Sequence, residues 1–229
     1  IKPSQRRPFT LFIERRTVYM KTIILNGSPR KSWNTAQLLQ KARRGAVDAG
    51  QAVEYFDLYD LNFTGCRSCL ACKRKDTPDP CRCYWQDDLT SLLEQVRKAD
   101  RLVLGSPIYY GEPTGVLRCF LERLVFPVMS YNDYSSIYPG HTDVDIFLTM
   151  NVGSEQYRQQ YEAKFQDYFQ PLHFLNGVTR IIPVCDTLQA EDYGRYNMAG
   201  FSEAHKKMMR ETQFPADLTQ AYQIGAGSL

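Results

Sequence analysis

The sequence predicts a doubly wound α/β fold, in which a five-stranded parallel sheet lies between two layers of helices. Five short apolar runs, each typical of a buried strand, recur along the chain, and a longer segment with helical periodicity follows each of them. Gly, Pro and polar residues separate many of these segments. Because strands that alternate with helices pair in parallel through right-handed crossovers, helices are expected on both faces of the sheet, giving a three-layer sandwich.

Each element has its own signal, in chain order. The apolar run 22–25 turns through Asn-Gly-Ser-Pro into a periodic segment, and the same alternation then repeats four times. The expected strands are 22–25, 52–58, 101–107, 143–151 and 179–185. The expected helices are 35–48, 89–99, 114–125, 156–175 and 202–214, the fourth being one long helix and the fifth closing the chain.

Length and composition predict one globular domain. The 229 residues are 43% hydrophobic and 23% charged, which is ordinary for a soluble protein, and a single α/β domain commonly reaches this size. No apolar run approaches the ~20 residues that span a bilayer. The net charge of +3 is too small and too scattered to favour nucleic acid as a partner.

The first 19 residues differ from the rest, so we expect residues 1–19 to be an extension or arm and 20–229 the domain, with a cysteine-rich insertion at about 61–86. An arginine pair precedes an apolar stretch there, but Glu14-Arg15-Arg16 interrupts it, which argues against an export signal. The seven cysteines are an odd number and five of them cluster, which favours a reducing cytoplasm over a disulfide framework.

The loop after the first strand has the composition of a phosphate site. Ligands of doubly wound sheets bind beyond the carboxyl ends of the strands. The stretch NGSPRKSWNT offers hydroxyl, amide and cationic groups just before a helix begins, and unpaired N–H groups at a helix start favour an anion. The spacing is neither that of a dinucleotide fold nor that of a Walker loop. The alternative is a plain turn, with Asn34 or Thr35 as the helix N-cap.

The loop after the third strand offers flat surfaces at the same edge. In GSPIYYGEP, glycines and prolines shape the loop, and Tyr109 and Tyr110 provide aromatic faces on which a flavin ring could stack. Tyrosines at the end of a strand are equally compatible with a rim of the core.

Together, the motifs NGSPRKSWNT, GCRSCLAC, the Asp87-Asp88-Leu89 triplet and GSPIYYGEPTGVLRCFLERL resemble the flavodoxin-like NADPH-dependent FMN reductase family, and the cysteines resemble its iron–sulfur flavoprotein branch. The similarity runs from about Met20 to Arg123. It implies a flavodoxin-like fold, noncovalent FMN, NAD(P)H or a ferredoxin-like protein as electron donor, and a homodimer or homotetramer.

The resemblance also implies which residues bind FMN. Ser28, Arg30, Asn34 and Thr35 would hold the phosphate. Five residues of the aromatic loop would line the isoalloxazine, namely Pro107, Ile108, Tyr109, Tyr110 and Gly111. Its other side would be closed by Asn151, Val152 and Gly153, in the loop after the fourth strand.

The cysteine segment leaves three possibilities open. Cys66, Cys69 and Cys72 have the C-x2-C-x2-C spacing that begins a [4Fe–4S] site. By analogy with the family, Cys83 is the favoured fourth ligand, because it precedes the aspartate pair, and Cys81 is the alternative. A bare reduced loop and a zinc site are the other possibilities, the zinc site comprising Cys66, Cys69, Cys81 and Cys83.

We therefore expect an FMN-dependent oxidoreductase that moves electrons from a reduced donor through the flavin to an acceptor. No catalytic acid or base is named, because hydride transfer needs stacking geometry more than proton chemistry. A non-enzymatic flavin and iron–sulfur electron carrier and a zinc-stabilised interaction module are the alternatives.

Overall fold

The computed structural model describes residues 19–228, so the predicted N-terminal arm lies outside the described residues except for Tyr19. Its centre is a parallel sheet with the strand order β2-β1-β3-β5-β6. The five strands are β1 (Lys21–Asn26), β2 (Ala52–Asp57), β3 (Arg101–Tyr109), β5 (Thr142–Thr149) and β6 (Asn176–Val184). A sixth, two-residue strand, β4 (Glu112–Pro113), pairs antiparallel with the end of β3. The predicted five-stranded parallel sheet is thus confirmed, with one short addition.

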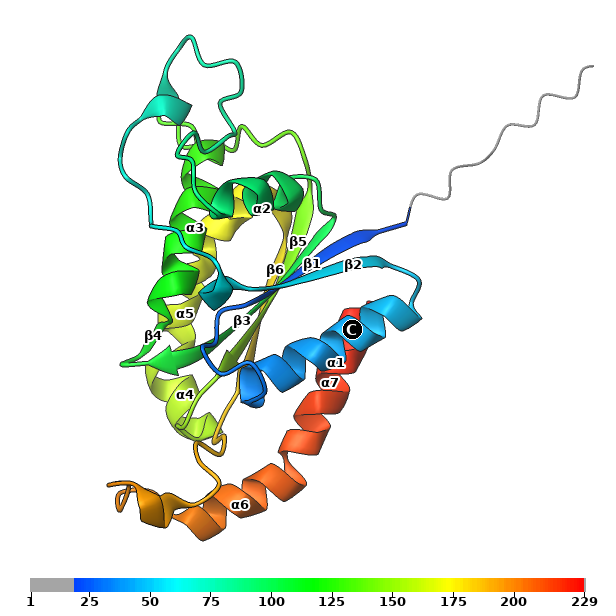
Figure 1. Cartoon of the computed structure of the whole chain (residues 1–229), viewed down its shortest axis with the longest axis vertical. Coiled ribbons are helices and arrows are strands. Elements are labelled where there is room, and N and C mark those ends of the chain that lie inside the picture. The colour runs from blue at the N-terminus through cyan, green and yellow to red at the C-terminus, as the bar shows by residue number, and fades with distance from the viewer. Residues whose placement is uncertain (1–18, 229) are drawn as a thin grey trace, which may run out of the picture.

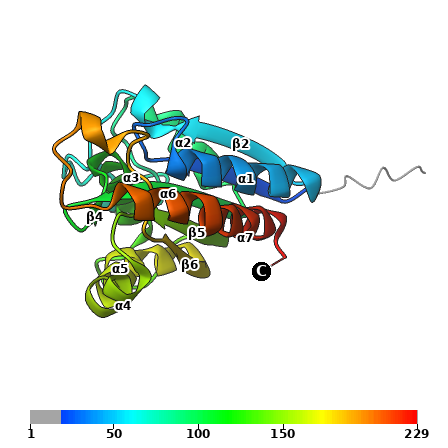
Figure 2. The same ribbon diagram turned by 90° about the horizontal axis from the view of Figure 1, so that it is seen from below.

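Helices cover both faces of the sheet (Figures 1 and 2). One face carries α1 (Asn34–Asp48) and α7 (Phe214–Ala226), which lie side by side in both views. The other face carries α2 (Leu89–Val96), α3 (Gly115–Val128), α5 (Glu162–Phe169) and the 3-10 helix η3 (Gln170–Leu175). The remaining helices are α4 (Ser154–Gln160), α6 (Glu203–Thr212) and the short 3-10 turns η1 (Leu58–Asp60), η2 (Ala71–Lys73) and η4 (Tyr193–Arg195).

Alternate strand residues enter two separate cores, which is why the fold has three layers. On β1, Ile23 and Leu25 pack toward α2 and α3, whereas Ile24 packs toward α1 and α7. Strand β5 divides in the same way, with Ile146 on the first side and Phe147 on the second. The inner strands β1 and β5 are therefore covered on both faces, as their near-continuous apolar sequences require.

Two of the predicted helices differ from the structure. The expected long helix 156–175 is divided at Tyr161, whose φ of −124° interrupts helical geometry although hydrogen bonds at 2.9 Å continue on both sides of it. The expected closing helix 202–214 is α6, and it does not close the chain. A further helix, α7, follows, because Pro215 ends one helix but is well suited to the first turn of the next.

Two features at the periphery of the sheet matter below. The edge strand β6 contains Pro183, which has no N–H group. The cysteine segment, teal in Figure 1, projects at one end of the molecule, and α6, in orange, lies at the other. Within residues 19–228, none of the helices has the length and apolar character needed to cross a membrane.

Candidate functional site

The loops that follow β1, β3, β5 and β6 meet at a cavity of about 230 Å³. The cavity lies beyond the carboxyl ends of the strands, where a doubly wound sheet binds its ligands. Of the predicted site residues, eight line it: Ser28, Arg30, Asn34, Thr35, Pro107, Ile108, Tyr109 and Asn151. Six further residues line it that the sequence analysis did not name: Trp33, Thr149, Met150, Thr187, Gln189 and Met198.

The loop before α1 presents its backbone to this cavity. Ser28 is buried, with its N–H bonded to Asn26 Oδ1 at 3.0 Å and its hydroxyl accepting the N–H of Arg30 at 3.1 Å. The N-cap of α1 is Trp33, which makes no capping hydrogen bond through its side chain. The alternative of Asn34 or Thr35 as N-cap is therefore wrong, and the first N–H groups of α1 have no side-chain cap.

Several of the predicted phosphate ligands contact the segment after β6. Asn34 Nδ2 and Trp33 Nε1 both donate to the carbonyl oxygen of Leu188, at 2.8 and 3.0 Å. Arg30 Nη1 donates to the carbonyl oxygen of Gln189 at 2.7 Å. The segment after β6 thus lies against residues 26–35, the phosphate-type loop. The carbonyl oxygens of the segment hold these side chains of the loop in place.

The aromatic loop is a tight hairpin. Ile108 and Tyr109 of β3 pair with Pro113 and Glu112, so Tyr110 and Gly111 form a two-residue turn. Both have positive φ, 52° and 74°, as the turn geometry of such hairpins demands. Tyr109 lines the cavity, whereas the ring of Tyr110 faces solvent.

The loop after β5 closes the cavity on another side through Met150 and Asn151. The Asn151 carbonyl accepts a hydrogen bond from Lys206 Nζ at 2.6 Å, and the Val152 carbonyl accepts one from the N–H of Asp186 at 2.8 Å. Val152 and Gly153 do not line the cavity. Their contact with a bound ring, like that of Tyr110 and Gly111, stays a prediction.

The cavity residues fit a phosphorylated polyol attached to a flat ring, which is what FMN is. Arg30 is the only charged side chain among its described lining residues, so an anion meets a cation and no carboxylate. Two buried oxygens at the cavity, Asn151 Oδ1 and Gln189 Oε1, have no hydrogen-bond partner, and a ligand hydroxyl would satisfy them. The aromatic face of Tyr109 lies at the half-exposed rim.

The cysteine segment brings four thiols to one small cavity. Cys66, Cys69, Cys72 and Cys83 all line a space of about 20 Å³ against α3. Cys81 lies elsewhere, in the apolar core, where its Sγ contacts the carbonyl oxygen of Ile137 at 3.2 Å. Cys83 therefore lines the same space as Cys66, Cys69 and Cys72, whereas Cys81 does not, and the choice of Cys83 as the fourth ligand stays a prediction.

The four thiols are a donor set that suits a thiolate-bound metal centre. The space between them, however, is too small to hold one in this conformation. A volume of about 20 Å³ holds roughly one water molecule. Across residues 19–228, no three His, Cys, Asp or Glu side chains are arranged to hold a metal ion. Cys66 and Cys69 are exposed, so a metal centre would require these two thiols to move inward.

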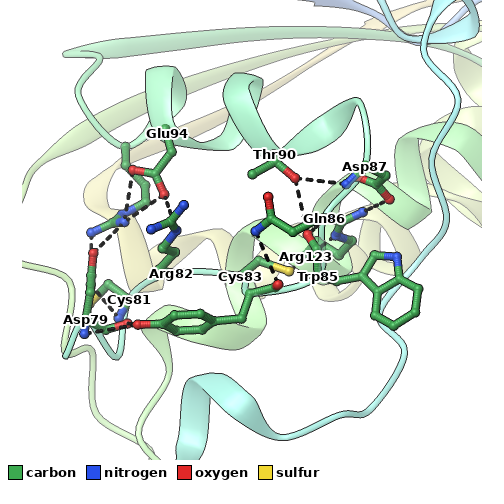
Figure 3. Close-up of polar contacts among 12 residues, drawn as sticks. Asp79, Cys81, Arg82, Cys83, Trp85, Gln86, Asp87, Thr90, Glu94 and Arg123 are labelled. Carbon is green, nitrogen blue, oxygen red and sulfur yellow. Dashed lines mark hydrogen bonds and ion pairs between the residues drawn. The ribbon is translucent and has the colours of Figure 1, made fainter. Parts of the chain in front are cut away.

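A buried arginine anchors this segment to α3 (Figure 3). Arg123 is paired with Asp87, donates to the Trp85 carbonyl at 2.8 Å and reaches Cys83 Sγ at 3.3 Å. Burial works to lower the pKa of Arg123, but the hydrogen bonds to Asp87 and Cys83 outweigh it and the pKa is raised. Burial raises the pKa of the Cys72 thiol, so this thiol is protonated at neutral pH when no metal is bound.

Two other cavities lie away from the strand ends. One of about 320 Å³ runs along α3 and η3 and is mainly apolar, and one of about 650 Å³ lies at the opposite edge of the sheet, beside Asp100 and Arg101. The first is lined by Cys66 of the segment after β2 but not by the loops after β1, β3, β5 and β6, and the second is lined by none of the loops that follow the strands. We therefore assign the ligand site to the smaller cavity at the carboxyl edge.

Fold and site together define a flavodoxin-like α/β protein with a phosphate-type loop. The sequence profile of the NADPH-dependent FMN reductase family matches residues 20–136, about half of the chain, and the chain belongs to this family. Residues 187–198, the segment after β6 that contributes to the cavity wall, lie outside the stretch that the profile matches.

Its curated relatives include iron–sulfur flavoproteins of two archaea. One from Methanocaldococcus jannaschii is 32% identical over 104 residues, which are 45% of this chain and 51% of the relative. One from Archaeoglobus fulgidus is 34% identical over 104 residues, or 45% and 48% of the two chains. The alignment thus spans about half the length of these relatives.

Solved structures agree over most of the chain. The NAD(P)H:quinone oxidoreductase from Methanothermobacter marburgensis has a TM-score of 0.68 at 15% identity, covering 91% of this chain and 98% of its own. The azoreductase from Bacillus anthracis has a TM-score of 0.62 at 13% identity, covering 91% and 99%. At these identities the likeness establishes the fold.

Proposed function

We propose that the chain binds FMN in the carboxyl-edge cavity and is a flavin-dependent oxidoreductase that draws electrons from NAD(P)H or from a ferredoxin-like protein. The observation that carries the proposal is the convergence of the loops after β1, β3, β5 and β6 on one cavity whose only charged lining residue is Arg30. Bound FMN would supply the redox chemistry by accepting and donating a hydride or single electrons.

The protein's own residues would bind and orient the cofactor. The uncapped first turn of α1, with Ser28 and Arg30, would hold the phosphate through N–H and guanidinium donors. Asn34 and Thr35 would shape the loop, since Asn34 bonds Leu188 and Thr35 Oγ1 bonds Thr149 Oγ1 at 2.7 Å. Pro107, Ile108 and Tyr109 would support one side of the ring. None of the described lining side chains carries a carboxylate or an imidazole, so we assign no lining residue a role in proton transfer.

The test compares Arg30→Met with Lys31→Met. Lys31 is the next residue but pairs with Asp60 instead of lining the cavity. Arg30→Met should weaken FMN binding, measured by fluorescence titration, about tenfold or more through loss of a charge-assisted hydrogen bond. It should weaken riboflavin, which lacks the phosphate, less than FMN, because riboflavin loses only the support that Arg30 gives to the Gln189 backbone, and Lys31→Met should change neither affinity.

Wild-type protein that does not bind FMN would overturn the proposal. If FMN binds, anaerobic addition of NADPH or NADH separates the remaining possibilities. Rapid loss of flavin absorbance supports an NAD(P)H-dependent enzyme, whereas inertness to both nicotinamides favours the electron carrier. Sedimentation of the loaded protein tests the homodimer or homotetramer that we propose with it.

A metal centre in the cysteine segment is a second candidate, favoured by the four thiols at one cavity. Cys66, Cys69, Cys72 and Cys83 would ligate a [4Fe–4S] cluster, which would serve as a one-electron partner of the flavin. Iron and acid-labile sulfide assays on anaerobically purified protein test this candidate. Stoichiometric iron that is lost in Cys83→Ser but retained in Cys81→Ser is the expected result, and zinc in place of iron would contradict it.

A further inference from the structure

The cavity has an unexplained polar group on the wall formed by the segment after β6. Gln189 Oε1 is buried and has no hydrogen-bond partner, and the residue lines the cavity. An unsatisfied buried amide oxygen is costly, and native structures generally pair such atoms with protein, water or ligand. Gln189 lies outside residues 20–136, the stretch that the family profile matches.

The backbone around Gln189 is fixed from several directions. Its N–H donates to the hydroxyl of Tyr193 at 3.0 Å, and its carbonyl accepts Arg30 Nη1 at 2.7 Å. The neighbouring Leu188 carbonyl accepts hydrogen bonds from Trp33 and Asn34. With the main chain held on both sides, the side chain of Gln189 is pre-positioned at the cavity, as a binding residue requires.

The base of the segment is fixed as well. The Thr187 N–H and hydroxyl both donate to the Met150 carbonyl, at 3.0 and 3.1 Å. Asp186 pairs with buried Lys206, whose Nζ also donates to the Asn151 carbonyl. The loops after β5 and β6 are thereby tied together, so Asn151 Oδ1, the second unsatisfied oxygen, holds a defined place relative to Gln189.

We propose that Gln189 binds the hydroxylated chain that joins the phosphate to the flat ring, and so selects ligands with such a chain. This rests on the proposed function. The backbone carbonyl of Gln189 accepts a hydrogen bond from Arg30, the cation that would meet the phosphate, so Gln189 lies on the cavity wall next to the proposed phosphate site, and the part of FMN next to the phosphate is the ribityl chain. Hydroxyl groups both donate and accept, so they match either atom of an amide.

The experiment measures Gln189→Met against three probes: FMN, riboflavin and lumiflavin, which lacks the ribityl chain. Met has a similar length but no amide, so FMN and riboflavin should each bind about fivefold more weakly, the effect of one lost hydrogen bond. Lumiflavin affinity should not change. Gln220→Met, on the exposed surface of α7, is the matched control and should leave all three affinities unchanged.

Thermal unfolding of the unliganded variants guards against a structural artefact. Removing an unsatisfied buried oxygen should leave the melting temperature of Gln189→Met unchanged or raised, and Gln189→Ala provides a second test of binding. Unchanged FMN affinity in both variants, or an equal loss for lumiflavin, would overturn the inference while FMN binding itself stands. Failure of wild type to bind FMN would instead overturn the proposed function.

Discussion

At the scale of single residues, Arg123 attaches the cysteine segment to α3 through several hydrogen bonds. Its side chain is fully buried, yet it comes from α3 and contacts Thr64, Trp85 and Asp87 of the segment. A charge this deep is tolerable only because the carboxylate and carbonyl oxygens surround it. Arg123 is therefore one of the groups that fix the segment to the fold, together with Lys73, which donates to the carbonyl oxygens of Pro127 and Met129.

Removing the counter-charge should be severe. Asp87→Ala leaves a buried guanidinium unpaired and should lower the free energy of unfolding by about 3 kcal/mol in urea denaturation, with Asp87→Asn intermediate. Asp76→Ala, which breaks the exposed pair with Arg74, is the control and should not move the midpoint. Equal midpoints for Asp87→Ala and wild type would show that the pair contributes nothing.

At the scale of elements, α1 and α7 pack with their backbones in contact. A Cβ added at Gly225 would overlap the carbonyl oxygen of Ala42, and one added at Gly45 would overlap that of Tyr222. Small residues at both positions let the two helices approach closely. Arg101 strengthens the same corner by donating to the carbonyl of Gly225 at 3.1 Å while pairing with buried Asp145.

Gly225→Ala should therefore separate the two helices. We expect a loss of about 3 kcal/mol in the free energy of unfolding, at the upper end of ordinary overpacking, because backbone atoms cannot turn aside as side chains can. Gly115→Ala is the matched control, since a Cβ at this first residue of α3 meets nothing within 4 Å. Calorimetric unfolding of both variants checks the prediction, and similar melting temperatures would contradict it.

At the scale of the whole molecule, the seven thiols differ in how exposed they are and in their pKa. Cys66 and Cys69 are exposed, Cys72 and Cys81 are buried, and the other three are intermediate. Burial raises the pKa of the Cys72 and Cys81 thiols, and it raises that of Cys185 to about 11. A raised pKa means less thiolate at a given pH, and thiolate is the reactive form.

Alkylation of unliganded protein with iodoacetamide at pH 8 should follow this order. Cys66 and Cys69 should be modified first, and Cys72, Cys81 and Cys185 last, as measured by peptide mass spectrometry over time. Modification of Cys185 should accelerate as the pH rises toward 11. All seven should react together in urea, which is the control, and early modification of Cys185 in folded protein would contradict the structure.

The sequence was most informative in two respects: the hydrophobic periodicity, and the rule that ligands of such a sheet bind at the loops beyond the carboxyl ends of the strands. The strands, the alternation of layers and the loops to inspect followed from these two signals, whereas the resemblance to the family singled out Ser28, Arg30, Pro107 and Asn151, which the structure brings to one cavity. Residues 187–198 have no periodicity, so their position against Trp33 depends on tertiary hydrogen bonds. The same rule pointed to the loop after β6, but no motif there singled out Gln189.

Other differences have local physical causes. The two-residue hairpin holds Tyr110 at positive φ and leaves its ring exposed, so its contact with the flavin stays a prediction. The helix α7 was not predicted, because the sequence analysis ended the closing helix at residue 214, whereas Pro215 lies in the first turn of a further helix. The choice of Cys83 over Cys81 rested on analogy with the family and stays a prediction.

The edge strand β6 has a consequence for aggregation and assembly. A neighbouring copy that tried to add its own strand beyond β6 would meet Pro183, which cannot donate to a ladder, and the N–H of Val178 already bonds to Asp143 Oδ1 within the chain at 2.8 Å. Extension of the sheet past β6 is therefore disfavoured at Pro183.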